Sequence, residues 1–224
     1  MIKAILFDFD GTLSNRQVNA YGVFDYYLRP YFASLSDLEY EAVLQDMILY
    51  DCNGTIPVEL RLIPFRDKYD KYLPEDFEDK FIPYYFDHMY EFCVLKKETI
   101  DVLEKLKGKY KMAVLSNGHS ISQHSKIRKV EIEKYFDEVL VSGDIGIDKP
   151  DKAIFEYMAD KLGVKIDECL MIGDVFSTDI IGAINAGVVP VWMVTDPEKP
   201  AYHYKGYRIS DLNEIFSVLE ELNS

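Results

Sequence analysis

The sequence of 224 residues is poor in cysteine and lacks the patterns of common zinc proteins. Its three cysteines, Cys52, Cys93 and Cys169, are too few and too widely spaced to form a disulfide framework. Neither a Cys-x-x-Cys pair nor a His-Glu-x-x-His segment is present, which argues against zinc sites of those kinds. A chain without a disulfide framework is typical of a reducing compartment, so we expect a cytoplasmic protein.

Long apolar segments and basic clusters are also absent. The longest segment without a charged residue, 180–195, contains Asn185 and Pro190 and is shorter than the ~20 apolar residues of a membrane helix. The first apolar run meets Asp8 without the cleavage site of a signal peptide. Lys and Arg number 25 against 39 Asp and Glu, a net charge of −14, which disfavours nucleic acid polymers and anionic membranes as partners. A monomer and a homodimer both remain open.

Short apolar runs alternate with helical periodicity over most of the chain. The runs have the length of β-strands, and they are 2–7, 111–115, 138–141, 170–172, 188–194 and 207–209. The helical segments are 99–106, 152–162, 179–186 and a last helix capped by Asp211 and ending near residue 222, with Gly108, Gly163 and Gly187 placed to end the first three. This alternation predicts an α/β fold, a doubly wound parallel sheet covered on both faces.

Residues 15–94 interrupt the alternation, because they have helical periodicity and no convincing strand. This segment holds 18 of the 31 aromatic residues of the chain. A small helical module has little volume, so large side chains must supply most of its buried area, and we interpret these aromatics mainly as core. The alternative is that some of them line a pocket.

Polar motifs follow several of the predicted strands. Asp8-Phe9-Asp10-Gly11-Thr12 ends the first strand, at the sheet edge where α/β folds bind ligands. Three more motifs follow in the chain, and they are Ser116-Asn117-Gly118, Lys149-Pro150 and Gly173-Asp174-x4-Asp179. Each one alone is ordinary turn, cap or surface chemistry. Because parallel strands bring their carboxyl ends to one edge, the set together predicts an active site.

The order of these motifs resembles the haloacid dehalogenase-like (HAD) hydrolase superfamily. The resemblance implies a Rossmann-like core, residues 1–14 and 95–224, with an all-helical cap, residues 15–94, inserted after the first strand. It implies a helical-cap (subfamily I) enzyme. Finer features, including Asn185 to Gly187 followed by Trp192, resemble the branch of nucleoside 5′-monophosphatases and acylneuraminate-9-phosphatases.

The charges of the motifs predict a divalent cation. Four carboxylates near Lys149 would repel one another and a phosphate dianion, and oxygen ligands together with phosphate suit Mg²⁺. By resemblance, Asp8 and Asp174 donate side-chain oxygens to the metal and Asp10 donates its backbone carbonyl. Asp179 acts partly through water or by orienting Lys149.

The resemblance also implies a reaction with a small-molecule phosphomonoester. Asp8 attacks phosphorus and forms an aspartyl-phosphate, and Asp10 serves as acid and then base. Ser116, the amide of Asn117 and Lys149 offset charge on the phosphoryl oxygens. The remaining residues expected at the phosphate are Gly11, Thr12 and Gly118.

Hydrolysis of a nucleoside monophosphate or sugar phosphate has two alternatives, and both remain open. Dehalogenases of this fold lack the second aspartate, so Asp10 favours phosphoryl chemistry, but sugar phosphomutases keep it. A non-catalytic binding module is the other alternative, although no required group is missing. We expect hinges at residues 14–16 and 92–96.

Substrate choice is expected to depend on the cap. The candidates are Asn15, Arg16, Asn53, Arg61 and Arg66, and for each the alternative is a solvated surface side chain. Ser14 and Asn15 depart from the commonest family pattern at this point. His119 is a further candidate for the cleft, whereas Trp192 is interpreted as packing.

Overall fold

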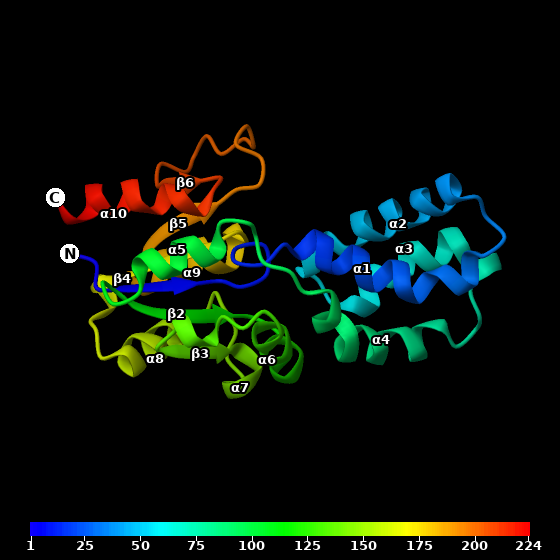
Figure 1. The fold of residues 1–224 in the computed structure, drawn as a ribbon, viewed down its shortest axis with the longest axis horizontal. Coiled ribbons are helices and arrows are strands. Elements are labelled where there is room, and N and C mark those ends of the chain that lie inside the picture. The colour runs from blue at the N-terminus through cyan, green and yellow to red at the C-terminus, as the bar shows by residue number, and fades with distance from the viewer. The chain divides into compact units, whose positions relative to one another are not determined.

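The chain forms two compact units. The computed structural model describes residues 1–224 (Figure 1). One unit consists of Met1–Ser14 and Leu95–Ser224, and we call it the core unit. The other is Asn15–Val94, and we call it the helical unit. None of the helices in either unit combines the length and apolar composition required to cross a membrane.

The core unit contains one parallel sheet of six strands. In chain order the strands are β1 (Ala4–Phe7), β2 (Lys111–Ser116), β3 (Glu138–Val141), β4 (Cys169–Gly173), β5 (Val189–Met193) and β6 (Tyr207–Ile209). Their order across the sheet is β3-β2-β1-β4-β5-β6, and every neighbouring pair is parallel. All six predicted strands are confirmed. β1 lies between β2 and β4, with Phe7 paired to Val114 on one side and Ile172 on the other.

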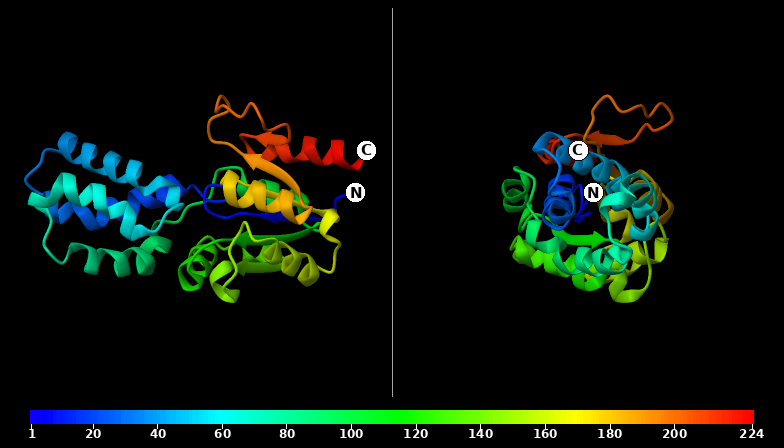
Figure 2. Two further views of the ribbon diagram at one scale, coloured as in Figure 1. Left: turned by 180° about the vertical axis from the view of Figure 1, so that it is seen from behind. Right: turned by 90° about the vertical axis from the view of Figure 1, so that its right-hand side faces the viewer.

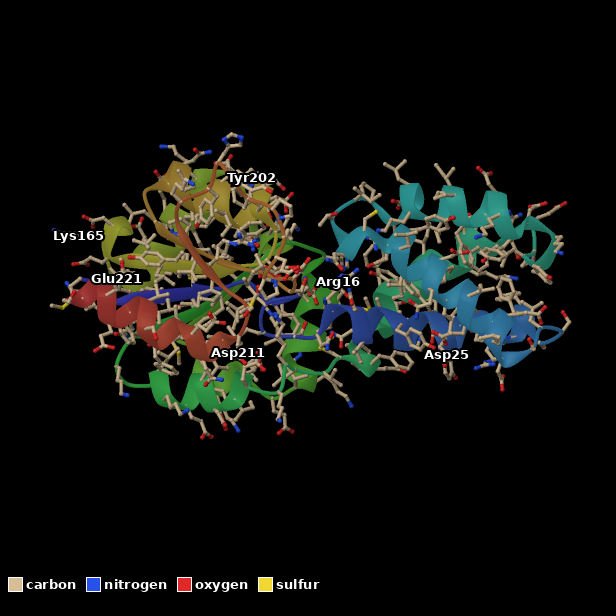
Figure 3. All side chains as sticks on the ribbon, turned by 90° about the horizontal axis from the view of Figure 1, so that it is seen from above. Arg16, Asp25, Lys165, Tyr202, Asp211 and Glu221 are labelled. Carbon is tan, nitrogen blue, oxygen red and sulfur yellow. The ribbon has the colours of Figure 1, made fainter.

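Both faces of the sheet are covered, as the near-continuous apolar strands predict. Leu6 and Met171 pack with α8 (Lys152–Leu162) and α9 (Ile181–Ala186) on one face. Successive strand residues point to opposite faces, and the alternate residue Phe7 is also fully buried. The other face is covered by α5 (Thr99–Leu106) and α10 (Ile215–Asn223). The layers can be followed in Figure 2, and Figure 3 marks the last helical segment with Asp211 and Glu221.

Two features of the core unit differ from the predicted elements. Helix α6 (Ser120–Lys129) is not predicted, because its buried residues include Ser122, Gln123 and Lys126 and the segment has no apolar stripe. The predicted helix 179–186 is preceded by a π-helical turn, Phe176–Ile180, and only the part from Ile181 is α-helical. The remaining short elements are α7 (Ser142–Ile145) and the 3-10 turns Glu133–Tyr135, Ile166–Glu168 and Leu212–Glu214.

The helical unit contains only helices and turns. The α-helices are α1 (Arg16–Leu28), α2 (Asp37–Asp51), α3 (Val58–Tyr69) and α4 (Phe77–His88), and each is followed by a 3-10 turn, in order Arg29–Phe32, Cys52–Gly54, Asp70–Tyr72 and Met89–Phe92. Its core cluster includes Phe24, Phe32, Phe65, Phe77 and Phe81, each almost fully buried. Ser36 and Glu39 form a capping box at the start of α2. The interpretation of these aromatics as mainly core is confirmed.

Candidate active site

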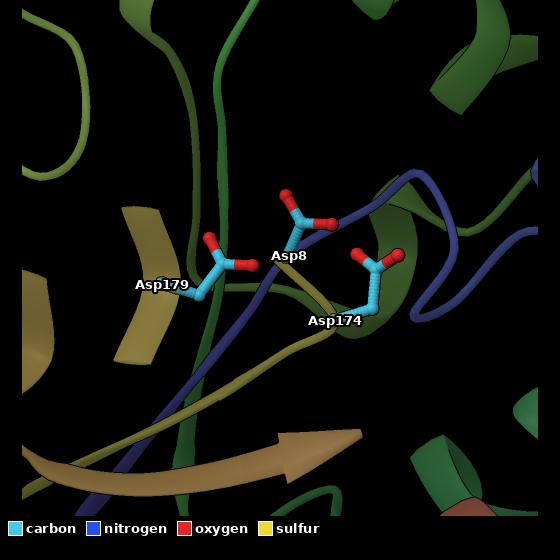
Figure 4. Close-up of side chains that lie close together, drawn as sticks. All are labelled: Asp8, Asp174 and Asp179. Carbon is cyan, nitrogen blue, oxygen red and sulfur yellow. The ribbon is translucent and has the colours of Figure 1, made fainter. Parts of the chain in front are cut away.

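Three carboxylates meet at the carboxyl edge of the sheet. Asp8 directly follows β1, and its backbone N–H donates to the Ile172 carbonyl at 2.8 Å. Asp174 directly follows β4, and Asp179 lies in the π-helical turn. One carboxylate oxygen from each residue lies within 4.8 Å of the others (Figure 4).

Lys149 is the cation of this cluster. Its Nζ lies 2.9 Å from Asp8 Oδ1 and 2.8 Å from Asp179 Oδ1, and it donates to the Leu115 carbonyl at 2.6 Å. The residue is only 2% exposed. The side-chain amide of Asn117 donates to the Lys149 carbonyl and accepts from the Lys149 backbone N–H, each at 2.8 Å, beside the cis Lys149-Pro150 bond. The backbone and the ammonium of Lys149 are therefore both held by residues at the end of β2.

The carboxylate of Asp179 is committed on both oxygens. Oδ1 faces Lys149, and Oδ2 accepts from the Val175 backbone N–H at 2.9 Å. Gly173 packs so closely on this side chain that a Cβ there would overlap the carboxylate. The geometry of Asp179 therefore suits a residue that orients Lys149.

Asp174, unlike Asp179, has a carboxylate oxygen without a partner in the protein. Its Oδ1 is buried and has no hydrogen-bond partner in the protein, while its backbone carbonyl accepts from Trp192 Nε1 at 3.0 Å. Gly11, with φ +86°, lies against the Asp174 carboxylate at a position where a Cβ would overlap it. A buried carboxylate oxygen without a donor is costly, so this oxygen fits a cation ligand.

The electrostatics of the cluster show the same deficit of positive charge. Burial raises the pKa of Asp8 to about 7, although Lys149 opposes the shift. Burial, followed by the charges of Asp8 and Asp179, raises the pKa of Asp174 well above its usual range. Burial alone would lower the pKa of Lys149, but the Asp179 and Asp8 carboxylates raise it above its ordinary value. The charge of Lys96 also favours the ionised form of Asp174, but the three carboxylates still outnumber the two ammonium groups. This oxygen-only set fits a hard divalent cation such as Mg²⁺.

Asp10 does not join this cluster through its side chain. Its Oδ2 accepts from Gln123 Nε2 at 2.9 Å and forms an ion pair with Lys126 Nζ. Its Oδ1 accepts from Ser14 Oγ at 3.3 Å. Of the four carboxylates expected near Lys149, Asp8 and Asp179 pair with it, whereas Asp10 pairs with Lys126. The charge of Asp10 still raises the pKa of Asp8. Sequence reasoning missed Gln123 and Lys126, which come from the helix that was not predicted.

The expected phosphate-binding residues lie at the same edge. Ser116 is buried, and its Oγ accepts from Gln123 Nε2 at 3.1 Å. The Thr12 hydroxyl is buried without a partner in the protein. The backbone N–H of Gly118 donates to Ser142 Oγ at 3.0 Å, so this amide already has a partner in the protein.

Two of the candidates for substrate choice are buried inside the helical unit. Arg16 and Arg61 are 7% and 6% exposed, and both form ion pairs with Asp51. Arg16 Nη2 and Arg61 Nη1 also donate to Tyr85 Oη, at 2.9 and 3.2 Å. For these two arginines the alternative of a solvated surface side chain is wrong.

The other candidates have simpler surroundings. Asn15 caps α1 by accepting from the Val18 backbone N–H at 3.3 Å, and Arg66 donates to the Pro74 carbonyl at 2.6 Å. Asn53 is exposed in the 3-10 turn after α2. His119 is exposed and is the N-cap residue of α6. Trp192 packs edge to face on Phe176, as its interpretation as a packing residue expects.

Comparison with curated proteins finds phosphatases of small molecules. The chain is 33% identical over 141 residues to glyceraldehyde 3-phosphate phosphatase of Methanothermobacter thermautotrophicus, covering 60% of this chain and 62% of that protein. It is 29% identical over 137 residues to the pyrimidine 5′-nucleotidase YjjG of Escherichia coli, covering 60% and 61%. It is 32% identical over 135 residues to human N-acylneuraminate-9-phosphatase, covering 58% and 53%. The chain therefore matches less than two thirds of the length of each of these relatives.

The chain also matches solved structures and a family model. The HAD-hydrolase YfnB of Bacillus subtilis, solved bound to magnesium, superposes with a TM-score of 0.76 at 24% identity over 97% of this chain and 98% of that one. A HAD phosphatase of Thermococcus onnurineus superposes with a TM-score of 0.67 at 26% identity, over 97% of this chain and 98% of that one. The family model described as haloacid dehalogenase-like hydrolase matches residues 2–187. With the predicted motifs at one edge of the predicted sheet, the chain belongs to the haloacid dehalogenase-like hydrolase family.

Proposed function

We propose that this protein is a Mg²⁺-dependent phosphatase that hydrolyses a small phosphomonoester, a nucleoside monophosphate or a sugar phosphate, through an aspartyl-phosphate. The observation that carries the proposal is the Asp8 carboxylate at the end of β1, which shares Lys149 with Asp179 and lies beside Asp174. The names of the matched relatives, all phosphatases or nucleotidases, support the same class of substrate.

In this proposal Asp8 and Asp174 hold Mg²⁺ with their side chains and Asp10 with its backbone carbonyl. The unpartnered Oδ1 of Asp174 supports this choice. When bound, the ion neutralises charge between the Asp8 carboxylate and the phosphate dianion and lets the two approach. Asp179 serves the site through Lys149.

The first step transfers the phosphoryl group to the protein. An Asp8 carboxylate oxygen forms a bond to phosphorus in line with the leaving oxygen, and the bond from phosphorus to that oxygen breaks. Asp10 gives its proton to the leaving oxygen, so the alcohol departs neutral. Lys149, the Ser116 hydroxyl and the Asn117 amide offset charge on the other phosphoryl oxygens.

The second step returns the protein to its starting state. Asp10, now a carboxylate, takes a proton from a water molecule as the water oxygen bonds to phosphorus. The bond from phosphorus to Asp8 breaks, and inorganic phosphate leaves. In this scheme we assign the helical unit, Asn15–Val94, the role of the family's cap, which sets substrate choice.

The test measures phosphate release from p-nitrophenyl phosphate and from a panel of nucleotides and sugar phosphates, with and without Mg²⁺. We expect Mg²⁺-dependent turnover that Asp8→Asn lowers by about 10³-fold or more, since the nucleophile is removed. Asp167→Asn, an exposed acid before β4, is the matched control and should behave as wild type. Turnover that survives Asp8→Asn, or that does not require a divalent cation, would refute the proposal.

A further inference from the structure

Helix α6 presents a buried polar face to the proposed acid and base, Asp10. Gln123 and Lys126 are three residues apart, so they lie on one face of the helix. They are 5% and 4% exposed, which is unusual for a glutamine and rare for a lysine.

Both side chains end on the same carboxylate oxygen. Lys126 Nζ forms an ion pair with Asp10 Oδ2, and Gln123 Nε2 donates to that oxygen at 2.9 Å. The Gln123 amide also lies 3.1 Å from Ser116 Oγ and 2.9 Å from the Asn117 carbonyl. Gln123 therefore links the carboxylate of Asp10 to the residues expected to hold the phosphate.

The backbone leaves room for this arrangement. Gly118 has φ +138°, and a Cβ there would lie 3.1 Å from the Gln123 side chain, closer than side chains normally pack. The positive φ and the space needed by the Gln123 side chain are therefore two physical reasons for glycine at this position.

The buried ion pair of Lys126 and Asp10 is not explained by stability alone. Removing an ammonium and a carboxylate from water costs several kcal/mol per ion, and apolar residues of similar volume are often at least as stabilising. The arrangement does fix the direction of one carboxylate, since two donors on a rigid helix hold one of its oxygens.

We infer that Lys126 and Gln123 are positioning residues that hold the Asp10 carboxyl for proton transfer to the leaving oxygen. The inference rests on the proposed function, because it requires Asp10 to act on the leaving group. In this role neither residue contacts the nucleophile, the phosphorus or the leaving oxygen. Their contribution is the position of Asp10 and, through Gln123, its link to Ser116.

The leaving group provides a readout that separates this role from a purely structural one. An alkyl phosphate releases a strongly basic oxygen that needs a proton, whereas p-nitrophenolate is a stable anion that needs hardly any help. Misplacing Asp10 should therefore lower kcat/KM far more for alkyl esters than for aryl esters, because kcat/KM reports the transfer to Asp8 and not the hydrolysis step that all esters share. A loss of folded protein would slow both equally.

The experiment compares Lys126→Met with Lys129→Met, an exposed lysine on the same helix. Kinetics are measured with p-nitrophenyl phosphate and with the sugar or glycerol phosphate that wild type hydrolyses best. General acid catalysis is worth about 10²–10⁴-fold, so for Lys126→Met we expect kcat/KM on the alkyl ester to fall by about 10–100-fold. We expect kcat/KM on the aryl ester to change by less than about threefold, and Lys126→Arg to recover most of the loss on the alkyl ester.

Gln123→Leu is the second variant, and it should give the same selective loss to a smaller degree. If Lys126→Met does not fold, as judged by its thermal transition, Gln123→Leu and Lys126→Arg carry the test. Equal losses of kcat/KM on both esters, or no change of kcat/KM on either, would overturn the inference. Failure of the proposed function is distinct, because wild type itself would then show no Mg²⁺-dependent turnover with either ester.

Discussion

Each unit of the protein buries a cluster of charges, and the two clusters have opposite composition. In the core unit three carboxylates lie together, and the ammonium of Lys149 pairs with two of them, Asp8 and Asp179. In the helical unit the single carboxylate of Asp51 is shared by the guanidinium groups of Arg16 and Arg61. Every member of the two clusters is buried except Asp174, which is partly exposed.

The clusters differ in how completely the protein satisfies them. Arg16 Nη2 lies 3.1 and 2.9 Å from the two oxygens of Asp51, and Arg61 lies 2.5 Å from one of them. In the core unit Asp174 keeps an oxygen with no donor. A buried ion cluster whose carboxylate is fully paired is typical of structure, whereas one with an unpaired oxygen and excess charge is typical of a ligand site.

Removing the ammonium of the core cluster should have the largest effect. Lys149→Met leaves Asp8 and Asp179 buried without a cation, and breaking a buried pair in this way costs about 3–5 kcal/mol. We expect that loss in the free energy of unfolding by urea, together with at least a hundredfold lower kcat. Lys152→Met, at an exposed lysine of α8, is the control. Unchanged stability would contradict this interpretation, since the charge of Lys149 would then not be needed to neutralise the buried carboxylates.

Removing the carboxylate of the helical cluster should cost nearly as much. Asp51→Asn leaves two buried guanidinium groups with a neutral partner, and we expect about 3 kcal/mol lower stability. Hydrogen exchange should show the loss of protection in α1 and α3. Asp67→Asn, an exposed acid on α3, should show none of it. An Asp51→Asn protein as stable as wild type would mean that this cluster is not structural.

Trp192 allows metal binding to be followed without turnover. It is the only tryptophan in the chain, and its indole donates to the Asp174 carbonyl at 3.0 Å. We expect Mg²⁺ to change its fluorescence and Trp192→Phe to weaken Mg²⁺ binding about tenfold, as loss of an outer hydrogen bond does in metal sites. The affinity of the variant is measured by thermal shift. Fluorescence that ignores Mg²⁺ while turnover requires it would argue against a metal at Asp174.

The stability of the metal-free protein should depend on pH. A carboxyl whose pKa is raised on folding binds its proton more tightly in the folded chain, so stability is lost as the pH rises through the shifted range. For Asp8 that range runs from 3.8 to about 7. The Tm of the metal-free protein should therefore fall between pH 5 and pH 7.5, and Mg²⁺ should restore it.

Asp174→Asn sharpens this point. The neutral amide removes one repelling charge, so at pH 7.5 the metal-free variant should be slightly more stable than wild type, seen as a higher Tm and the smallest of these effects. Mg²⁺ should no longer raise its Tm. A metal-free variant less stable than wild type would show that the three carboxylates are not in excess.

Much of the core unit could be predicted because its signals are local. Each strand is a short apolar run, and the rule that parallel strands end at one edge placed Asp8, Ser116 and Asp174 together. The partners of Asp10 and Asp51 could not be predicted in this way. Gln123 lies 113 residues from Asp10 on a helix whose buried face is polar, so hydrophobic periodicity gives no signal for it. Arg16 reaches Asp51 across 35 residues, and only the packing of α1 against α2 selects that pair.

The position of β1 in the sheet has a consequence for the order in which the chain acquires its structure during synthesis. β1 is made first, but its neighbours begin at Lys111 and Cys169, so its edges stay unpaired until most of the chain has been made. The helical unit is continuous in sequence and needs only residues 15–94. It can therefore form from local contacts before β1 has either of its neighbours in the sheet.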